Sequence, residues 1–185
     1  MKFNPLITLL SSALLCALSL SPALADEAPA QPSATTAQSL SLRLSPLGGS
    51  AADSVRQAGE GVQNLVDGAL ELVGIRYRRG GTNEETGFDC SGFVGYVFKE
   101  KLGLLLPRTS REISRTGTAV ARSELAPGDL VFFNTRRNAF SHVGIYLGDN
   151  LFVHAPKPGQ RVRVEDMRAR YWTARFNGAR RIEGV

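Results

Sequence analysis

The first part of the compact sequence carries hydrophobic residues at helical spacing. In segment 62–73 they recur every three or four positions, which is typical of one face of an amphipathic helix, and Gly74 then supplies a stop. The segment that begins at Cys90 shows the same spacing. We therefore expect helices over 62–73 and 90–101, with a short third helix within 108–117.

The later part of the chain changes to the patterns of β-strands. Short segments rich in β-branched and aromatic residues follow one another and are separated by turn residues. They are 128–133, 142–148, 151–155, 160–166 and 177–183. Because helices come first and strands afterwards, the predicted fold class is α+β, with the helices packed on one antiparallel sheet. The Gly-rich segment 75–87 is expected to be a loop.

The N-terminus has the pattern of a secretion signal. Lys2 precedes a mostly apolar run over residues 6–20, and the "ALA" at 23–25 offers small residues at the two positions that a cleavage site requires. The run is shorter than the ~20 residues that span a bilayer. We predict that residues 1–25 are a cleaved signal peptide, and that the protein is exported to the periplasm or the cell wall without a transmembrane segment in its mature form.

The composition divides the remaining chain into two parts. Residues 26–60 are rich in Ala, Ser, Pro, Gln and Thr and predict a flexible linker, which leaves residues 61–185 for one domain. The chain carries a net charge of +5, and losing Lys2 with the signal reduces this to +4. No dense Lys/Arg run with interleaved aromatic residues is present, which argues against a nucleic-acid partner. A mild positive charge suits contact with anionic envelope material.

The cysteine count raises a chemical question. Of the two cysteines, Cys16 lies in the predicted signal after the bulky Leu15, which disfavours a lipoprotein site, so the mature chain keeps Cys90 alone. A lone thiol in an exported protein is inert, paired between chains, a metal ligand or a nucleophile. Cys90 follows Asp89, a good N-cap, at the start of a predicted helix. The unpaired N–H groups and the dipole there stabilise a thiolate and can hold an oxyanion.

The mature chain has two histidines, and both lie in one predicted hairpin. In "HVGIYLGDNLFVHA" a three-residue turn at 148–150 would place Gly144 opposite His154, so that His142 and His154 share a face in diagonal contact. A two-residue turn would put them on opposite faces. The hypothesis is Cys90 as nucleophile, His142 as base and His154 as the group that orients the base. The alternative is a zinc site of the same three residues, but their spacing matches no common metal pattern.

At these residues the sequence resembles the NlpC/p60 family of secreted cysteine peptidases. The resemblance covers residues 62 to about 183 and rests on five blocks in the family's order. They are "YRRGGTNEETGFDCSGFVGYVF", "LPRTS", "LAPGDLVFF", "HVGIYLGDNLFVHA" and "YWTARFNGARRI". The chain is most similar to the small Spr/MepS-like murein endopeptidases, which lack an attached SH3-like domain.

The resemblance implies a papain-like α+β fold that hydrolyses amide bonds in peptidoglycan peptides through a thioester, with no metal or organic cofactor. It assigns the nucleophile to Cys90, the base to His142 and the third polar position to His154. It also implies that Tyr77 supports the oxyanion. Asp89 and Ser91 match positions that contact substrate in some members, although a helix cap already accounts for Asp89.

The sequence leaves two candidates for the peptidoglycan bond that is cut. Family members cut either the D-Glu–diaminopimelate bond or the D-Ala–diaminopimelate crosslink, and the small form leans toward the crosslink. Substrate carboxylates could be bound by arginines near the cleft, for which the candidates are Arg76, Arg78, Arg79 and Arg108. Tyr171 and Trp172 are expected in the core or the cleft wall. The alternatives are a non-catalytic peptidoglycan-binding module, or another thiol amidase or acyltransferase on the same fold.

Overall fold

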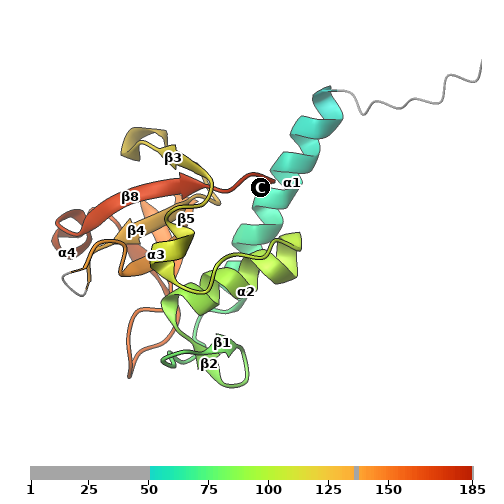
Figure 1. The fold of residues 1–185 in the computed structure, drawn as a ribbon. Helices are drawn as coiled ribbons and strands as arrows, with labels where there is room; N and C mark the ends of the chain where they lie inside the picture. Colours follow the sequence, from blue (N-terminus) through green and yellow to red (C-terminus); the bar gives the residue numbers. More distant parts are fainter. Residues whose placement is uncertain (1–50, 136–137, 185) are drawn as a thin grey trace, which may run out of the picture. The chain divides into compact units, whose positions relative to one another are not determined.

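An antiparallel sheet of six strands forms the centre of the protein (Figure 1). The structure, a computed structural model, describes residues 51–135 and 138–184. In spatial order the strands are β3 (Thr118–Val120), β8 (Phe176–Arg181), β4 (Leu130–Phe133), β5 (His142–Gly148), β6 (Leu151–His154) and β7 (Arg163–Asp166). A two-stranded ribbon of β1 (Thr82–Asn83) and β2 (Gly87–Phe88) lies apart from this sheet. The expected α+β class is confirmed.

The helices precede most of the strands, as the hydrophobic pattern predicted. The elements are α1 (Ala51–Glu71), α2 (Cys90–Leu102), α3 (Ser110–Ile113), the 3₁₀ turn η1 (Arg122–Glu124) and α4 (Arg170–Thr173). The C-terminal half of α1 packs beside α2, and α2 packs on β5 (Figure 1). Gly103 ends α2 in a left-handed conformation with φ 68°, which is why the helix stops there.

The sheet has a packed core on each face because side chains alternate along its strands. In β4, Leu130 and Phe132 join the core that α1 and α2 cover, whereas Val131 and Phe133 point to the opposite face. That second core also contains Trp172 of α4. A strand buried on both faces reads as a continuous apolar run, which "LVFF" is.

Residues 51–60 were expected to belong to the flexible linker, but in the structure they are helical. Helix α1 therefore begins eleven residues before the predicted start. Composition favoured a tether there because large apolar residues are scarce. The helix instead carries same-face ion pairs from Arg56 to Asp53 at 3.3 Å and to Glu60 at 3.9 Å. Such pairs and alanines support a helix that buries little. The predicted signal at 1–25 and the linker residues 26–50 lie outside the described residues.

Several short elements were not expected. The segment predicted as a loop contains β1 and the first residue of β2, and the sheet has the additional strand β3 at its edge beside β8. These strands have two or three residues, too few to show alternation. The predicted strands 128–133, 151–155, 160–166 and 177–183 are present with ends shifted by one to three residues, and 142–148 matches β5.

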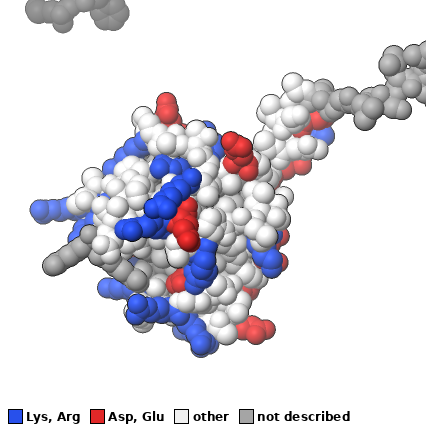
Figure 2. Space-filling model, in the orientation of Figure 1, with Lys and Arg blue, Asp and Glu red and all other residues white. Residues whose placement is uncertain are grey.

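Charges are mixed on the visible surface of the described domain. Figure 2 shows Lys and Arg side chains interspersed with Asp and Glu on this face. Within the described residues, no helix is long and apolar enough to cross a membrane.

Candidate active site

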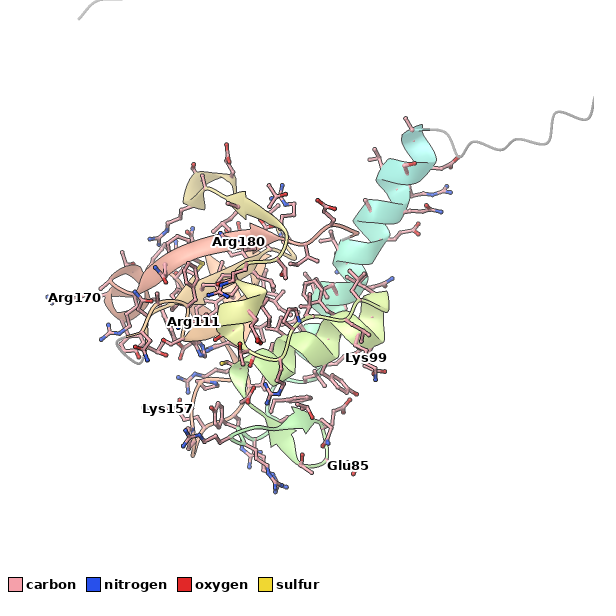
Figure 3. All side chains as sticks on the ribbon, in the orientation of Figure 1. Glu85, Lys99, Arg111, Lys157, Arg170 and Arg180 are labelled. Carbon is pink, nitrogen blue, oxygen red and sulfur yellow. The ribbon has the colours of Figure 1, made fainter. Side chains whose placement is uncertain are left out.

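A cleft of about 620 Å³ opens where the start of α2 meets the sheet. Cys90, Tyr77 and His142 line it, although they come from three separate parts of the chain. The cleft is also lined by the loop between β6 and β7, which carries Lys157 (Figure 3), and by residues of β7 and α4. The predicted nucleophile and the predicted base therefore share one cavity.

The start of α2 is fixed by Asp89, which caps the helix as expected. One carboxylate oxygen accepts hydrogen bonds from the Gly92 N–H at 2.7 Å and the Ser91 hydroxyl at 3.2 Å. The other accepts from the Gly80 N–H at 3.0 Å, and Arg108 binds both oxygens at 3.1 and 2.6 Å. Burial raises the pKa of Asp89, but Arg108 and the Gly92 N–H more than offset it and hold the pKa below its usual range. This network sets the position of Cys90, the first residue of the helix.

Glycines allow a loop to approach this helix closely. A Cβ at Gly92 would stand 2.0 Å from the carbonyl oxygen of Gly81, so no other residue fits without moving the loop. The Asp89 N–H donates to the same carbonyl at 3.0 Å. The loop at Gly81 thereby packs directly against the first turn of α2 and fixes the position of its backbone N–H groups.

The histidines lie together at the same end of the sheet. Their ring nitrogens, His142 Nε2 and His154 Nδ1, are 2.6 Å apart, and the side chains are almost fully buried. Ile145 pairs with Val153, which is the register that the sequence predicted. Both imidazoles consequently point to the same face.

The turn that produces this register differs from the expected one. Asp149 and Asn150 both have positive φ, 51° and 63°, as a two-residue type I′ turn requires, and Gly148 already pairs with Leu151. A plain hairpin of this kind would separate the histidines. A register shift between Tyr146 and Gly148 inserts one extra residue, a β-bulge, and restores the shared face.

Two further side chains, Glu165 and Trp172, contact the histidines. Glu165 of β7 places Oε2 at 3.5 Å from His154 Nε2 and also accepts a hydrogen bond from the Trp172 indole N–H. The Trp172 ring stacks on His142, with centroids 5.7 Å apart and planes at 21°. Burial lowers the pKa of His154 despite the nearby carboxylate.

The sequence pointed to other polar residues as well, and the structure distributes them differently. Tyr77 lines the cleft and is held by its backbone N–H, which donates to the Gln160 carbonyl at 2.8 Å. Asp89 and Ser91 do not line the cleft but join Arg108 in the network that supports α2. Of the positively charged side chains, those that line the cleft are Lys157 and Arg163, and none of the expected arginines do.

Within the described ranges, no group of three His, Cys, Asp or Glu side chains has the geometry to hold a metal ion. This finding concerns side-chain geometry alone.

The comparisons with known proteins decide the family. Residues 74–181, more than half of the chain, match the model of the NlpC/P60 family. The chain belongs to the NlpC/P60 family. The matched region contains Cys90, both histidines and every strand of the central sheet.

Two curated relatives of this NlpC/P60 chain come from Escherichia coli strain K12. One, named murein DD-endopeptidase MepS/murein LD-carboxypeptidase, is 44% identical over 118 residues, which are 64% of this chain and 61% of the relative. The other, murein DD-endopeptidase MepH, is 40% identical over 116 residues, 61% of this chain and 43% of the relative. The matched part thus spans less than two thirds of either relative.

A solved NlpC/P60 structure resembles the fold. The crystal structure of a lipoprotein-like NLP/P60 family protein from Staphylococcus aureus has a TM-score of 0.60 and 36% identity. The match covers 66% of this chain and 41% of that chain.

Glu165 and Trp172 were not assigned a role from the sequence. The pairing of β6 with β7, in which Phe152 faces Glu165 and His154 faces Arg163, puts Glu165 on the face of the histidines. The sequence did not predict that register, because the connection from 155 to 162 contains a turn, closed by the Gln160 N–H donating to the Lys157 carbonyl at 3.1 Å, and a bridge between Arg161 and Arg76. Trp172 was expected in the core or the cleft wall, and it contributes to both.

Gly144 provides a test of the packing between the histidines. A Cβ at this position would meet the Val153 carbonyl oxygen at 2.8 Å and the His154 Cβ at 3.1 Å. We expect Gly144→Ala to lower the free energy of unfolding by about 1–3 kcal/mol, the usual cost of overpacking. Urea unfolding followed by circular dichroism measures it.

Gly95 offers the matched control for that substitution. It lies within α2, and a Cβ there would meet nothing within 4 Å. Gly95→Ala should raise stability by up to about 1 kcal/mol, because alanine is the better helix former. Equal effects of the two substitutions would contradict the packing described around the histidines.

Proposed function

We propose that the protein is an exported cysteine peptidase that hydrolyses amide bonds in the peptide part of peptidoglycan. The observation that carries the proposal is that His142, which lines the same cleft as Cys90, lies 2.6 Å from the ring of the buried His154. A thiol needs a base to act as a nucleophile, and the base needs a partner that orients it. The three residues supply these roles.

The proposed reaction has two steps. The Cys90 thiolate attacks the carbonyl carbon of the scissile amide, and the tetrahedral oxyanion is held by N–H groups at the start of α2 and by the Tyr77 hydroxyl. His142, protonated, gives its proton to the leaving amine, which departs and leaves a thioester on Cys90. Water, deprotonated by His142, then attacks the thioester, so that the acid product leaves and the thiolate is restored.

The cleft also supports a substrate with several carboxylates. Lys157 and Arg163 line the same cleft as Cys90, and each can bind a carboxylate of a stem peptide. Two relatives are named murein DD-endopeptidases, which favours the D-Ala–diaminopimelate crosslink over the bond within the stem as the substrate. In this proposal the signal over residues 1–25 delivers the enzyme to the periplasm or the cell wall.

Digestion of purified sacculi tests the proposal. We expect the protein to convert crosslinked dimeric muropeptides into monomers, identified by liquid chromatography with mass spectrometry. Treatment with iodoacetamide should stop the reaction, whereas EDTA should leave it unchanged, because the mechanism uses a thiol and no metal. Unaltered muropeptide profiles, or a loss of activity in EDTA that added zinc restores, would contradict a thiol peptidase.

A further inference from the structure

We propose that Glu165 is a positioning residue of the cleft, whose carboxylate holds the proton of His154 on Nε2 and thereby sets which nitrogen of His142 acts as base. The inference rests on the function proposed above, because it concerns the same site. It concerns a β7 residue outside the Cys-His-His set.

The surroundings of His154 Nε2 favour a proton on this nitrogen. The His154 side chain is fully buried, and within the described residues this nitrogen has no hydrogen bond of good geometry. The Oε2 of Glu165 faces it at 3.5 Å, the long end of hydrogen-bond range. A buried ring nitrogen next to a carboxylate is stabilised as an N–H donor, because an ionised carboxylate can only accept. Its Nε2 therefore carries the proton.

The protonation of the remaining ring nitrogens follows from this one. Burial lowers the pKa of His154 and so favours its neutral form, and with a proton on Nε2 the Nδ1 of the neutral ring has a lone pair and accepts. The 2.6 Å contact then requires His142 Nε2 to donate. A neutral His142 that donates through Nε2 keeps Nδ1 unprotonated, and that atom is the base.

The position of Glu165 is itself fixed by two further contacts. Arg163 donates through Nε to Oε1 at 2.5 Å, and Trp172 donates through its indole N–H to Oε2. Burial raises the pKa of Glu165, but its hydrogen bonds with His154 and Arg163 and the charge of Arg163 more than offset it and hold the pKa below its usual range. The carboxylate is thus ionised throughout the neutral range.

The same tryptophan links Glu165 to both imidazoles. Its ring meets His154 edge-on, with centroids 5.0 Å apart and planes at 90°, and stacks on His142. Rotation of either imidazole would break an aromatic contact as well as a hydrogen bond. Glu165 and Trp172 therefore act together to hold the orientation of the histidines.

The test combines a structural readout with kinetics. Two-bond ¹⁵N–¹H correlation spectra of the ¹⁵N-histidine-labelled protein report which ring nitrogen is protonated. For the wild type we expect Nε2–H on both His142 and His154. Glu165→Leu removes the acceptor, and we expect His154 to lose the Nε2–H form and kcat/KM on sacculi to fall roughly 10- to 100-fold, the range found when a carboxylate that orients a metal-binding histidine is removed. Glu165→Gln keeps an oxygen acceptor and should retain most of the Nε2–H form of His154 and most of the wild-type kcat/KM.

Glu84 supplies the control. It accepts a hydrogen bond from the Tyr96 hydroxyl at 2.5 Å and does not line the cleft, so Glu84→Leu removes a comparable contact between a carboxylate and an aromatic side chain elsewhere. It should change neither the tautomers nor kcat/KM.

Two results would overturn the role of Glu165. One is a wild-type His154 that carries its proton on Nδ1, and the other is an unchanged tautomer in Glu165→Leu. If Glu165→Leu does not fold, the wild-type spectrum and the Glu165→Gln variant still test whether Glu165 positions the proton of His154. Because the spectra need no substrate, failure of the positioning role is distinguishable from failure of the peptidase proposal.

Discussion

Replacing Cys90 by alanine should abolish the hydrolysis of peptidoglycan, with a fall of at least about 10³-fold in kcat. In the proposed mechanism the thiolate forms the covalent bond to the substrate carbonyl, and no other cysteine remains after loss of the predicted signal. Removal of the nucleophile from a triad leaves only the rate that the oxyanion site and substrate binding provide. Quantification of muropeptide monomers released from sacculi measures the effect.

Folding and binding need to be separated from catalysis in that experiment. Cys90 is half-buried at the cleft, and alanine is smaller and has good helix propensity, so the variant should unfold at nearly the same urea concentration as the wild type. It should also still sediment with sacculi. A Cys90→Ala variant that releases monomers at the wild-type rate would contradict the assignment of the nucleophile and favour a site elsewhere.

Replacing His142 by alanine should produce the second-largest loss, about 10³-fold in kcat, even though Cys90 remains. In the proposed mechanism the imidazole takes the thiol proton and gives a proton to the leaving amine, so both steps should fail without it. His154 cannot substitute, because it is fully buried and already meets His142 through Nδ1. The measurement is again the release of monomers from sacculi, now at several pH values.

The control for His142 is the conservative variant His142→Gln. Its amide can preserve a hydrogen bond to His154 but cannot carry a proton to the leaving group, so it should be as inactive as alanine while being more stable. If His142→Gln retained a tenth or more of the wild-type kcat, the role of His142 as proton carrier would be wrong.

The sequence contained enough information to predict how the histidines pair. Alternating residues in "HVGIYLG" and "LFVHA" determine which side chains share a face, and the sheet keeps that register. The prediction depended on a three-residue turn, yet the turn has two residues and a bulge makes up the difference. The sequence therefore predicted that the two histidines share a face of the sheet. It did not predict that a two-residue turn and a β-bulge would produce this register.

The residues around the histidines could not be predicted because they depend on tertiary packing. Glu165 lies in "RVRVED", where alternating charges normally indicate a solvated face, and only the pairing of β6 with β7 brings it to His154. Trp172 reaches the same place through α4, a helix of four residues with no detectable periodicity. Asp89 was recognisable as a helix cap from its position before Cys90, whereas its bond to Arg108 joins segments whose approach no local pattern encodes.

The rate at which iodoacetamide alkylates Cys90 at pH 6 tests most directly whether thiol and imidazole work together. A thiolate paired with His142 at a helix start is reactive at a pH where an ordinary thiol is protonated. The account predicts that wild-type protein is alkylated at least about tenfold faster than His142→Ala, measured by intact-protein mass spectrometry. Equal rates in the two proteins would show that the imidazole does not activate the thiol, and would contradict the proposed mechanism.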